Sequence, residues 1–352
     1  MLSRLRNRCL SAAGLLSATA MLAVISIPAQ AQEKVTLKVA DIFPTTHYIV
    51  TKGSQVWMDK AVELSGGRIE FQYFPAQQLG KAADILSLTQ SGVADIGAVA
   101  PAYVGEKMPL TAAGELPHMF DSACAGSAAL TTLAQPDGLL GKAEYNPQHV
   151  RLLFANMLAP YTVMTADAPL NSYKDLKGLK IYASGGAKDV TLRTLGAVPI
   201  RLTGPELFQA VQRRTIDGTM LSYNSLEPYK LQPMLKYGLT GVNLGSTAIT
   251  YIISDKKWAT LPQDIQKFLI DAAAFATKSL CEHSDSANKN EMEELEAMGA
   301  KVHVIDGDEK TEILKTLEPV RSEWAANLDK NGKPATEIVN AFRKLVDEYK
   351  GD

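Results

Sequence analysis

The chain has 352 residues, of which 46% are hydrophobic and 21% are charged, and its formal net charge is −2. This length exceeds one ordinary hydrophobic core and favours two domains. Because the small net charge provides no global basic field, nucleic acid and anionic membrane surfaces are poor candidates for partners.

The first 31 residues have the pattern of a secretory signal peptide. Three arginines precede a mostly small and apolar run over residues 10–27, and the Ala-Gln-Ala sequence at 29–31 suits a signal peptidase. A transmembrane anchor is the competing interpretation, since the run approaches spanning length, but Gly14 and Pro28 argue for cleavage. We therefore predict a cleaved signal peptide over residues 1–31, a periplasmic mature protein and no direct membrane insertion.

Two cysteines, Cys124 and Cys281, would remain after cleavage. In an oxidising compartment they can form a disulfide, but the sequence does not show whether their Cα atoms come within bonding range. The alternative, to which we give equal weight, is that both cysteines are buried free thiols. Neither cysteine has the Cys-x-x-Cys spacing of a redox or zinc site, which argues against catalytic thiol chemistry.

The first half of the mature chain alternates between strand-like and helix-like segments. Strands are expected at residues 35–42, 68–74 and 96–99, and a helix is expected at 48–64, where apolar residues recur at helical spacing. A second helix precedes the third strand, and a loop with Pro and Tyr at 101–103 follows it. This order, with short loops, predicts a largely parallel sheet with helices on both faces.

The second half continues the alternation and ends in a helical tail. In chain order we expect one or two strands at residues 150–164, a strand at 180–182, a helix at 184–195, a strand at 198–202, a helix at 206–211 and a strand at 220–223. The tail is expected to be helical over residues 262–298, as one long helix or two, and again over 319–349. We interpret the acidic run at 291–296 as a solvated face.

Two stretches of the chain share one pattern. In Gln90-to-Gly97 and in Gln212-to-Gly218, an amphipathic segment ends at Gln-x-x-x-x-Asp and gives way to a strand or turn. The repeat predicts two similar α/β halves. Because large pockets favour domain interfaces and the carboxyl ends of strands, it also predicts a cleft between them.

Five motifs occur in the order and spacing of one protein family. They are Phe74-Pro-Ala-Gln-Gln-Leu-Gly80, the Gln90-to-Gly97 stretch, Asp175-Leu-Lys-Gly-Leu-Lys-Ile181, Leu195-Gly-Ala-Val-Pro199 and Glu206 to Gly218. With them, the chain from about Val35 to beyond Gly299 resembles the DctP-type extracytoplasmic solute-binding proteins of tripartite ATP-independent periplasmic (TRAP) transporters. The resemblance implies a protein that closes on a small organic acid and delivers it to a sodium-driven permease with one small and one large membrane subunit.

The resemblance also implies an α/β fold, namely the two-lobed periplasmic binding protein fold with a ligand cleft between the lobes and long C-terminal helices. We predict lobe 1 over residues 32–155 and lobe 2 over residues 156–250. The long helices over residues 251–352 are expected to pack on both lobes and bridge them.

One position departs from the family pattern. Family members usually have an arginine two residues after the lysine of Gly-Leu-Lys-Ile/Val-Arg, and it holds the ligand carboxylate bidentately. This chain has Tyr182 there. Three alternatives stay open: the helix start at Ser184 and the following two glycines binds the anion, Arg201 supplies the charge, or the ligand is neutral, aromatic or cationic.

Tyrosines at strand–loop junctions predict an aromatic-walled pocket. Thr162 lies near the place where some family members have a second arginine, and Asn224 lies in the region that supplies a polar ligand contact. The candidate ligand-binding residues are therefore Tyr48, Tyr103, Tyr161, Thr162, Tyr182, Ser184, Arg201, Tyr223 and Asn224. For any single tyrosine, half-buried packing is the competing interpretation.

A periplasmic enzyme is the chief rival class. The five histidines form no i, i+4 metal pair, and the sequence has neither a Gly-x-Ser-x-Gly elbow nor a Gly-x-x-x-x-Gly-Lys phosphate loop. His47 is the only plausible base, and we interpret it as a cap or packing residue. We therefore predict a binding protein without enzymatic activity or cofactor, and we identify no metal-ligating residues; a binding protein that serves a sensor or an ATP-driven importer is the second rival.

Overall fold

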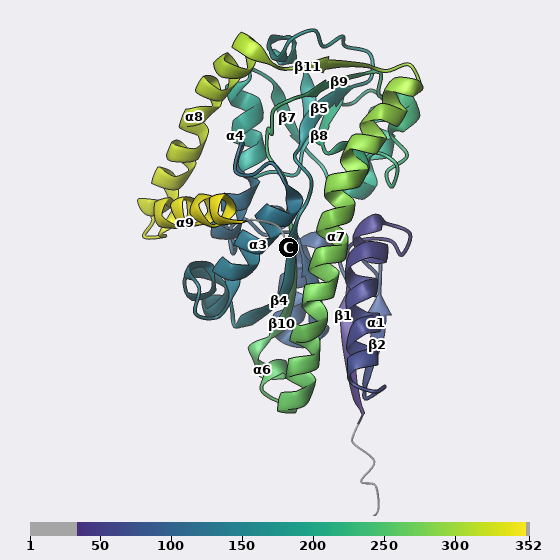
Figure 1. The fold of residues 1–352 in the computed structure, drawn as a ribbon, viewed down its shortest axis with the longest axis vertical. Helices are drawn as coiled ribbons and strands as arrows, with labels where there is room; N and C mark the ends of the chain where they lie inside the picture. Colours follow the sequence, from purple (N-terminus) through teal and green to yellow (C-terminus); the bar gives the residue numbers. More distant parts are fainter. Residues whose placement is uncertain (1–33, 350–352) are drawn as a thin grey trace, which may run out of the picture. The chain divides into compact units, whose positions relative to one another are not determined.

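Two mixed β-sheets form the framework of residues 34–349, the part of the chain described by the computed structural model (Figure 1). The predicted signal peptide lies outside the described residues. Within residues 34–349, no helix combines the length and the apolar character needed to cross a membrane.

The first sheet has the strand order β2-β1-β3-β10-β4. Its strands are β1 (Val35–Ala40), β2 (Ile69–Phe74), β3 (Ile96–Val99), β4 (Val150–Met157) and β10 (Ala248–Ser254). Strand β1 pairs in parallel with β2 and β3, whereas β10 is antiparallel to β3 and β4. Strands β1 to β4 therefore run in one direction, as a largely parallel sheet requires, and β10 alone, which enters this sheet from the second one, runs in the opposite direction.

The second sheet has the order β11-β9-β5-β8-β6-β7. Its strands are β5 (Thr162–Thr165), β6 (Lys180–Ala183), β7 (Val198–Arg201), β8 (Gly218–Leu221), β9 (Tyr237–Thr240) and β11 (Lys301–Val304). Strand β6 pairs in parallel with β7 and β8, and β5 is antiparallel to β8 and β9. Each sheet therefore contains a parallel three-stranded unit, and beside it one strand, β10 in the first sheet and β5 in the second, runs in the opposite direction.

Helices cover these sheets. They are α1 (Gln55–Leu64), α2 (Ile85–Ser91), α3 (Ala123–Ala134), α4 (Ala187–Thr194), α5 (Leu207–Gln212), α6 (Asp255–Trp258), α7 (Gln263–Ala297), α8 (Gly307–Asp329) and α9 (Ala335–Glu348). A π-helical turn, η1 (Val50–Ser54), leads into α1, and a 3₁₀ segment, η4 (Leu110–Glu115), lies between β3 and α3.

The helical tail differs in part from its prediction. Residues 263–297 form one continuous helix, α7, which Figure 1 shows running from the region of β4 and β10 to that of β5 and β9. The expectation that the next helix begins at Pro319 is wrong, because α8 begins at Gly307 and contains Pro319 in its interior. The break falls instead at residues 330–334, where the Asp329 carboxylate accepts the backbone N–H of Ala335 (2.8 Å) at the start of α9.

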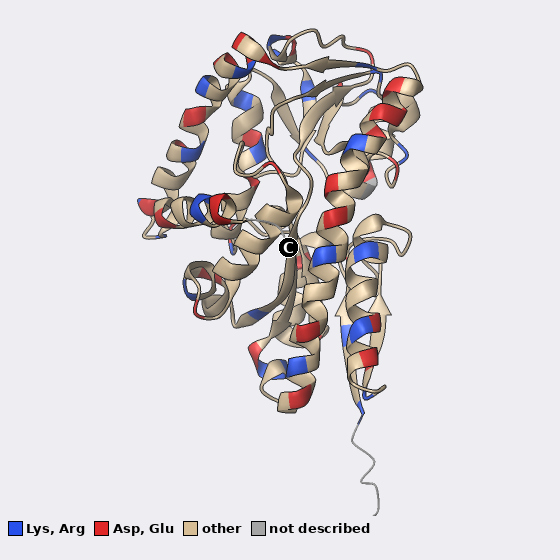
Figure 2. Cartoon of the chain, viewed as in Figure 1, with Lys and Arg blue, Asp and Glu red and all other residues tan. Residues whose placement is uncertain are grey.

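Most of the acidic run at residues 291–296 of α7 is exposed to solvent, as expected for a solvated helix face. Glu293, Glu294 and Glu296 are exposed, and Figure 2 shows acidic residues along this part of the helix. Glu291 is partly buried and accepts a hydrogen bond from Gln232. These charges therefore need no ligand to explain them.

The repeated Gln-x-x-x-x-Asp stretches have matching contacts in the two sheets. Asp95, before β3, accepts the backbone N–H of Lys38 through its carboxylate (2.8 Å) and donates its own N–H to the Lys38 carbonyl (3.0 Å). Asp217, before β8, makes the same two bonds to Lys180, at 2.7 Å each. The sequence pattern thus indicates the same pair of hydrogen bonds between an aspartate and a neighbouring strand in two similar halves.

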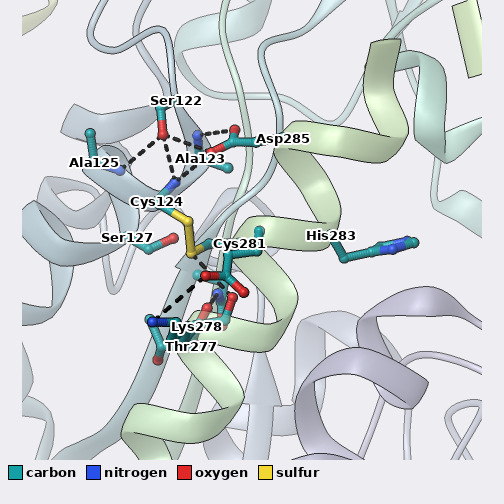
Figure 3. Close-up of a disulfide and its surroundings, with 12 residues drawn as sticks. Ser122, Ala123, Cys124, Ala125, Ser127, Thr277, Lys278, Cys281, His283 and Asp285 are labelled. Atoms are coloured by element: carbon teal, nitrogen blue, oxygen red, sulfur yellow. Dashed lines mark hydrogen bonds and ion pairs between the residues drawn. A yellow bond between two sulfur atoms is a disulfide. The ribbon is translucent and has the colours of Figure 1, made fainter. Parts of the chain in front are cut away.

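A disulfide joins α3 to α7 (Figure 3). The Cα atoms of Cys124 and Cys281 are 4.8 Å apart, which resolves the choice between a disulfide and free thiols. One helical turn further along α7, Asp285 accepts hydrogen bonds from the Ser122 hydroxyl (2.7 Å) and the Ala123 N–H (2.6 Å) at the start of α3. A covalent bond and a helix cap therefore fasten these two helices at one place.

Candidate ligand-binding site

A small cavity lies where loops that follow strands of the two sheets meet, and its volume is about 30 Å³. Its walls are aromatic, aliphatic or hydroxyl-bearing. They consist of Phe43, His47, Ile49, Ala100, Ala102, Tyr103, Leu158, Tyr161, Tyr182, Ser184, Leu221, Ser225, Tyr229, Thr247 and Ile249. Residues 43–49 follow β1 of the first sheet, and residues 182–184 belong to the end of β6 in the second, so both sheets supply walls.

Four tyrosines, Tyr103, Tyr161, Tyr182 and Tyr229, contribute to these walls. Burial raises the pKa of all four hydroxyls, and for the last three it does so well above the ordinary value. The phenols are therefore uncharged at neutral pH. Among the described residues that line the cavity, none is Lys, Arg, Asp or Glu.

His47 is almost completely buried in the same wall, with 2% of its surface exposed. Its Nδ1 accepts the backbone N–H of Ile49 (3.2 Å), whereas its Nε2 is buried without a hydrogen-bond partner among the described residues. Its ring packs against those of Phe43 (4.7 Å between centroids), Tyr48 (4.8 Å) and Tyr229 (5.4 Å). Burial lowers the pKa of the imidazole to about 3, so it is neutral at pH 7.

Ser184 lies at the end of β6 and lines the cavity with a buried hydroxyl that also has no partner among the described residues. The next two residues turn the chain into α4. Gly185 and Gly186 have φ values of 101° and 64°, a region that favours glycine, so the sequence needs both glycines for this turn.

A larger pocket of about 600 Å³ adjoins the cavity and shares Ala102, Tyr103 and Ser184 with it. Arg201 lines this outer pocket and not the cavity. Its side chain is 69% exposed, and its Nε donates to the buried carboxylate of Asp189 (2.6 Å). Arg201, which the sequence offered as a source of the missing charge, is therefore already paired with a carboxylate in the outer pocket.

Tyr48 and Asn224 do not line the cavity themselves, but each is next in the sequence to a residue that does. The Tyr48 hydroxyl is 3.3 Å from the hydroxyl of Ser225, which lines the cavity, and burial raises the pKa of this phenol to about 12. Asn224 is 3% exposed, and neither its side-chain oxygen nor its nitrogen has a partner among the described residues. A buried amide without a partner, next in the sequence to a wall residue, is a candidate second contact for a ligand.

Thr162 and Tyr223 point into the second sheet. Both hydroxyls donate to the same acceptor, the backbone carbonyl of Leu239, at 2.6 Å and 2.9 Å. The structure thus places Tyr103, Tyr161, Tyr182 and Ser184 together on the cavity wall, and it places these two residues away from it.

A buried lysine two residues after Gly186 also has its charge paired with a carboxylate. Lys188, in α4, forms a salt bridge with Glu115, and both side chains are fully buried. Lys188 also donates to the carbonyl of Ser246 (2.9 Å), and Glu115 accepts the N–H of Ala248 (3.1 Å). The positive charge is therefore balanced inside the protein.

Sequence reasoning missed three prominent wall residues, Phe43, His47 and Tyr229. Phe43 and His47 follow the first predicted strand, so their place at a strand end was a usable signal. Tyr229 lies in a loop between β8 and β9, where no periodicity marks it. The orientation of His47 depends on its bond to Ile49, which no sequence pattern reveals.

Comparisons with known proteins agree with this architecture. The model of the family named DctP, "Bacterial extracellular solute-binding protein, family 7", matches residues 41–327. The C4-dicarboxylate-binding periplasmic protein DctP of Rhodobacter capsulatus is 26% identical over 89% of this chain and 93% of its own length. The ectoine-binding periplasmic protein TeaA of Halomonas elongata is 23% identical over 77% of this chain and 79% of its own.

Solved structures of TRAP solute-binding proteins have the same fold. One from Rhodoferax ferrireducens, in complex with copurified benzoate, superposes with a TM-score of 0.81 at 24% identity and covers 90% of this chain and 98% of its own. One from a marine metagenome, with 3-hydroxybenzoate, has a TM-score of 0.83 at 23% identity over 91% and 100%. The chain belongs to the DctP family of bacterial extracellular solute-binding proteins and has the two-lobed fold of its TRAP members.

Proposed function

We propose that this protein is the periplasmic solute-binding subunit of a TRAP transporter, which captures a small organic acid between its lobes and delivers it to a sodium-coupled permease. The observation that carries the proposal is the buried cavity, to which both sheets contribute aromatic side chains and unpartnered polar atoms. Buried polar groups without partners cost free energy, and a ligand that bonds to them recovers it. Membership of the DctP family supports the transport role.

Within organic acids, we propose an aromatic monocarboxylate. Five aromatic rings line the cavity, namely Phe43, Tyr103, Tyr161, Tyr182 and Tyr229, and such rings pack well on an aromatic ligand. The hydroxyls and the imidazole of the wall are available for one carboxylate. Benzoate and 3-hydroxybenzoate, which two similar structures contain, are of this chemical kind.

Binding requires the walls to move. A volume of about 30 Å³ holds one or two water molecules, which is far less than a benzoate needs. We therefore propose that the lobes separate to admit the ligand and close around it, with the backbone change absorbed at the segments between the sheets. The outer pocket is the entrance.

A neutral, aromatic or amine ligand is the second candidate, and the uncharged wall favours it. Without a lysine or arginine in the wall, a carboxylate must be held by neutral donors alone. An amine would instead interact with the faces of the phenols, since aromatic rings attract cations. The two candidates differ in the charge of the ligand, so a ligand panel separates them.

The membrane partners and the location are proposed on the family and the N-terminal sequence. We expect one small and one large membrane subunit as partners, and a periplasmic location after cleavage of residues 1–31. We also propose that the protein has no enzymatic activity. Neighbouring genes for two such subunits would support the first proposal, whereas genes for an ATPase or a sensor kinase would favour a rival transporter or a sensor.

A thermal-shift panel tests the function. It should contain aromatic monocarboxylates, aliphatic mono- and dicarboxylates, keto acids, benzyl alcohol and benzylamine. A true ligand at about 100 times its Kd stabilises the protein by about 2.7 kcal/mol. We expect the largest shift with an aromatic acid; a flat response across all classes would refute the proposal, and conversion of a bound compound to a product would identify an enzyme.

A further inference from the structure

We propose that His47 is a ligand-binding residue whose Nε2–H donates to the ligand carboxylate, so that the site holds an anion with uncharged donors alone. This inference rests on the proposed function and adds the means of recognition. It assigns to the imidazole the role that the arginine at the position of Tyr182 has in other family members.

The local backbone determines which imidazole nitrogen carries the hydrogen. The N–H of Ile49 donates to Nδ1 of His47 (3.2 Å), so Nδ1 must have a free lone pair. In a neutral imidazole the hydrogen then lies on Nε2. His47 therefore presents a donor, and not an acceptor, at Nε2.

That donor lies in the cavity wall. His47 is 2% exposed, and its Nε2 has no hydrogen-bond partner among the described residues. The Ser184 hydroxyl, also unpartnered, lines the same cavity. Because His47 follows β1 of the first sheet and Ser184 follows β6 of the second, a carboxylate that accepts from both would connect the two lobes.

Among the described residues, none of the rings that pack against the imidazole is charged at neutral pH. On its own segment it packs against Phe43 and Tyr48, and on the loop after β8 it packs against Tyr229, whose pKa is raised by burial. From α7, the ring of His283 packs against Tyr48 (5.5 Å between ring centroids). The nearest carboxylate along the chain, Asp41, accepts hydrogen bonds from Ser54 and from two other hydroxyls.

Protonation of His47 is disfavoured in two ways. Burial alone lowers its pKa, and a second hydrogen on Nδ1 would point at the N–H of Ile49. The bound carboxylate is therefore stabilised by charge-assisted hydrogen bonds from neutral donors, as an oxyanion is. Binding should proceed without uptake of a proton by the protein.

Calorimetric titration of the whole mature protein with benzoate and 3-hydroxybenzoate tests the role of His47. His47→Phe removes both nitrogens and keeps a packed ring, and loss of a bond to a charged group should weaken binding about 10- to 100-fold. His283→Phe is the matched control, because it removes a histidine from the same aromatic cluster one ring further away. We expect this control to bind within about threefold of the wild type.

The proton balance provides a test that needs no variant. The wild-type titration should give equal enthalpies in phosphate and Tris buffers and one Kd from pH 6 to 8.5. Uptake of about one proton per ligand, or a Kd that rises tenfold per pH unit, would identify a histidinium and overturn the inference. Equal affinity of wild type and His47→Phe would also overturn it and leave the proposed function intact, whereas a wild type that binds no compound of the panel would overturn both.

Discussion

At the residue scale, Tyr182 occupies the position where the family resemblance leads us to expect an arginine, and it changes how the site is built. A buried guanidinium would need a partner, whereas a phenol is stable in an uncharged wall. Tyr182 is 4% exposed, and burial raises its pKa, with a further contribution from the neighbouring phenols of Tyr103 and Tyr161. A phenol at this position fits the rest of the cavity wall, since the side-chain hydrogen-bonding groups of the wall are all neutral.

We expect Tyr182→Phe to weaken binding of an aromatic carboxylate about tenfold, because one hydrogen bond to the ligand is lost. The melting temperature of the free protein should stay nearly unchanged. Tyr223→Phe is the matched control: its hydroxyl donates to Leu239 within the second sheet, so it should lose about 1 kcal/mol of stability and keep the Kd. A large loss of stability in the ligand-free Tyr182→Phe variant would identify Tyr182 as a structural residue.

His47 also predicts a pH dependence of stability. Its pKa is about 3 in the folded protein against 6.5 ordinarily, so below pH 6.5 the unfolded chain gains a proton that the folded protein does not take up. The contribution of the neutral imidazole to the free energy of unfolding is therefore complete above pH 6.5 and is lost as the pH falls toward 3. Between pH 6.5 and 4.5 the wild type should lose roughly 2–3 kcal/mol more than His47→Phe, which cannot titrate there. Urea unfolding of both proteins at the two pH values measures this; equal losses would show that the imidazole is accessible to protons in the folded state.

The candidate site was only partly predictable from single residues. Tyr103, Tyr161, Tyr182 and Ser184 lie at strand ends, and the structure places all four on the cavity wall; their contact with a ligand stays a prediction. Thr162 follows Tyr161 directly, and because neighbouring residues of a strand point to opposite faces, it turns into the second sheet instead. A sequence can place a residue at a strand end, but it does not show which face that residue occupies.

At the element scale, the two halves were recognisable because their Gln-x-x-x-x-Asp stretches lie in the same local structure. The mixed character of both sheets was not recognisable, since β10 and β5 carry no sequence mark of the direction in which they run. Helix α3 was missed because it is rich in Ala and buried over most of its length, so it shows little amphipathic periodicity. Pro319 misled the prediction of α8, because proline is usual at a helix start and rare inside.

The disulfide should contribute strongly to stability. It joins residues 157 positions apart, and in the chain-entropy model such a link restricts the unfolded chain by about 5 kcal/mol. We expect Cys124→Ser/Cys281→Ser to unfold with about 2–5 kcal/mol less free energy than the oxidised wild type. Urea unfolding with and without reductant measures this; the reductant should affect only the wild type, and an unchanged stability would mean that the Asp285 cap alone holds α3 to α7.

At the scale of the whole molecule, the buried salt bridge ties α4 of the second half to η4. Lys188→Met should cost about 3–5 kcal/mol, because it leaves the Glu115 carboxylate buried without a counter-charge. Adding Glu115→Gln removes that charge and keeps an acceptor for the N–H of Ala248. The double variant should therefore be more stable than the single one by chemical denaturation; a further loss would show that the carboxylate has another partner.

The predicted division into residues 32–155, 156–250 and 251–352 stays a proposal, and the strand pairing bears on it directly. The described chain passes from the first sheet to the second after β4, returns for β10, and passes again to β11. Neither sheet is thus made from one continuous stretch. A single proteolytic cut between the sheets would therefore leave the strands of at least one sheet divided between two fragments. Transplanting one lobe into a relative would require exchange of several separate segments of the gene.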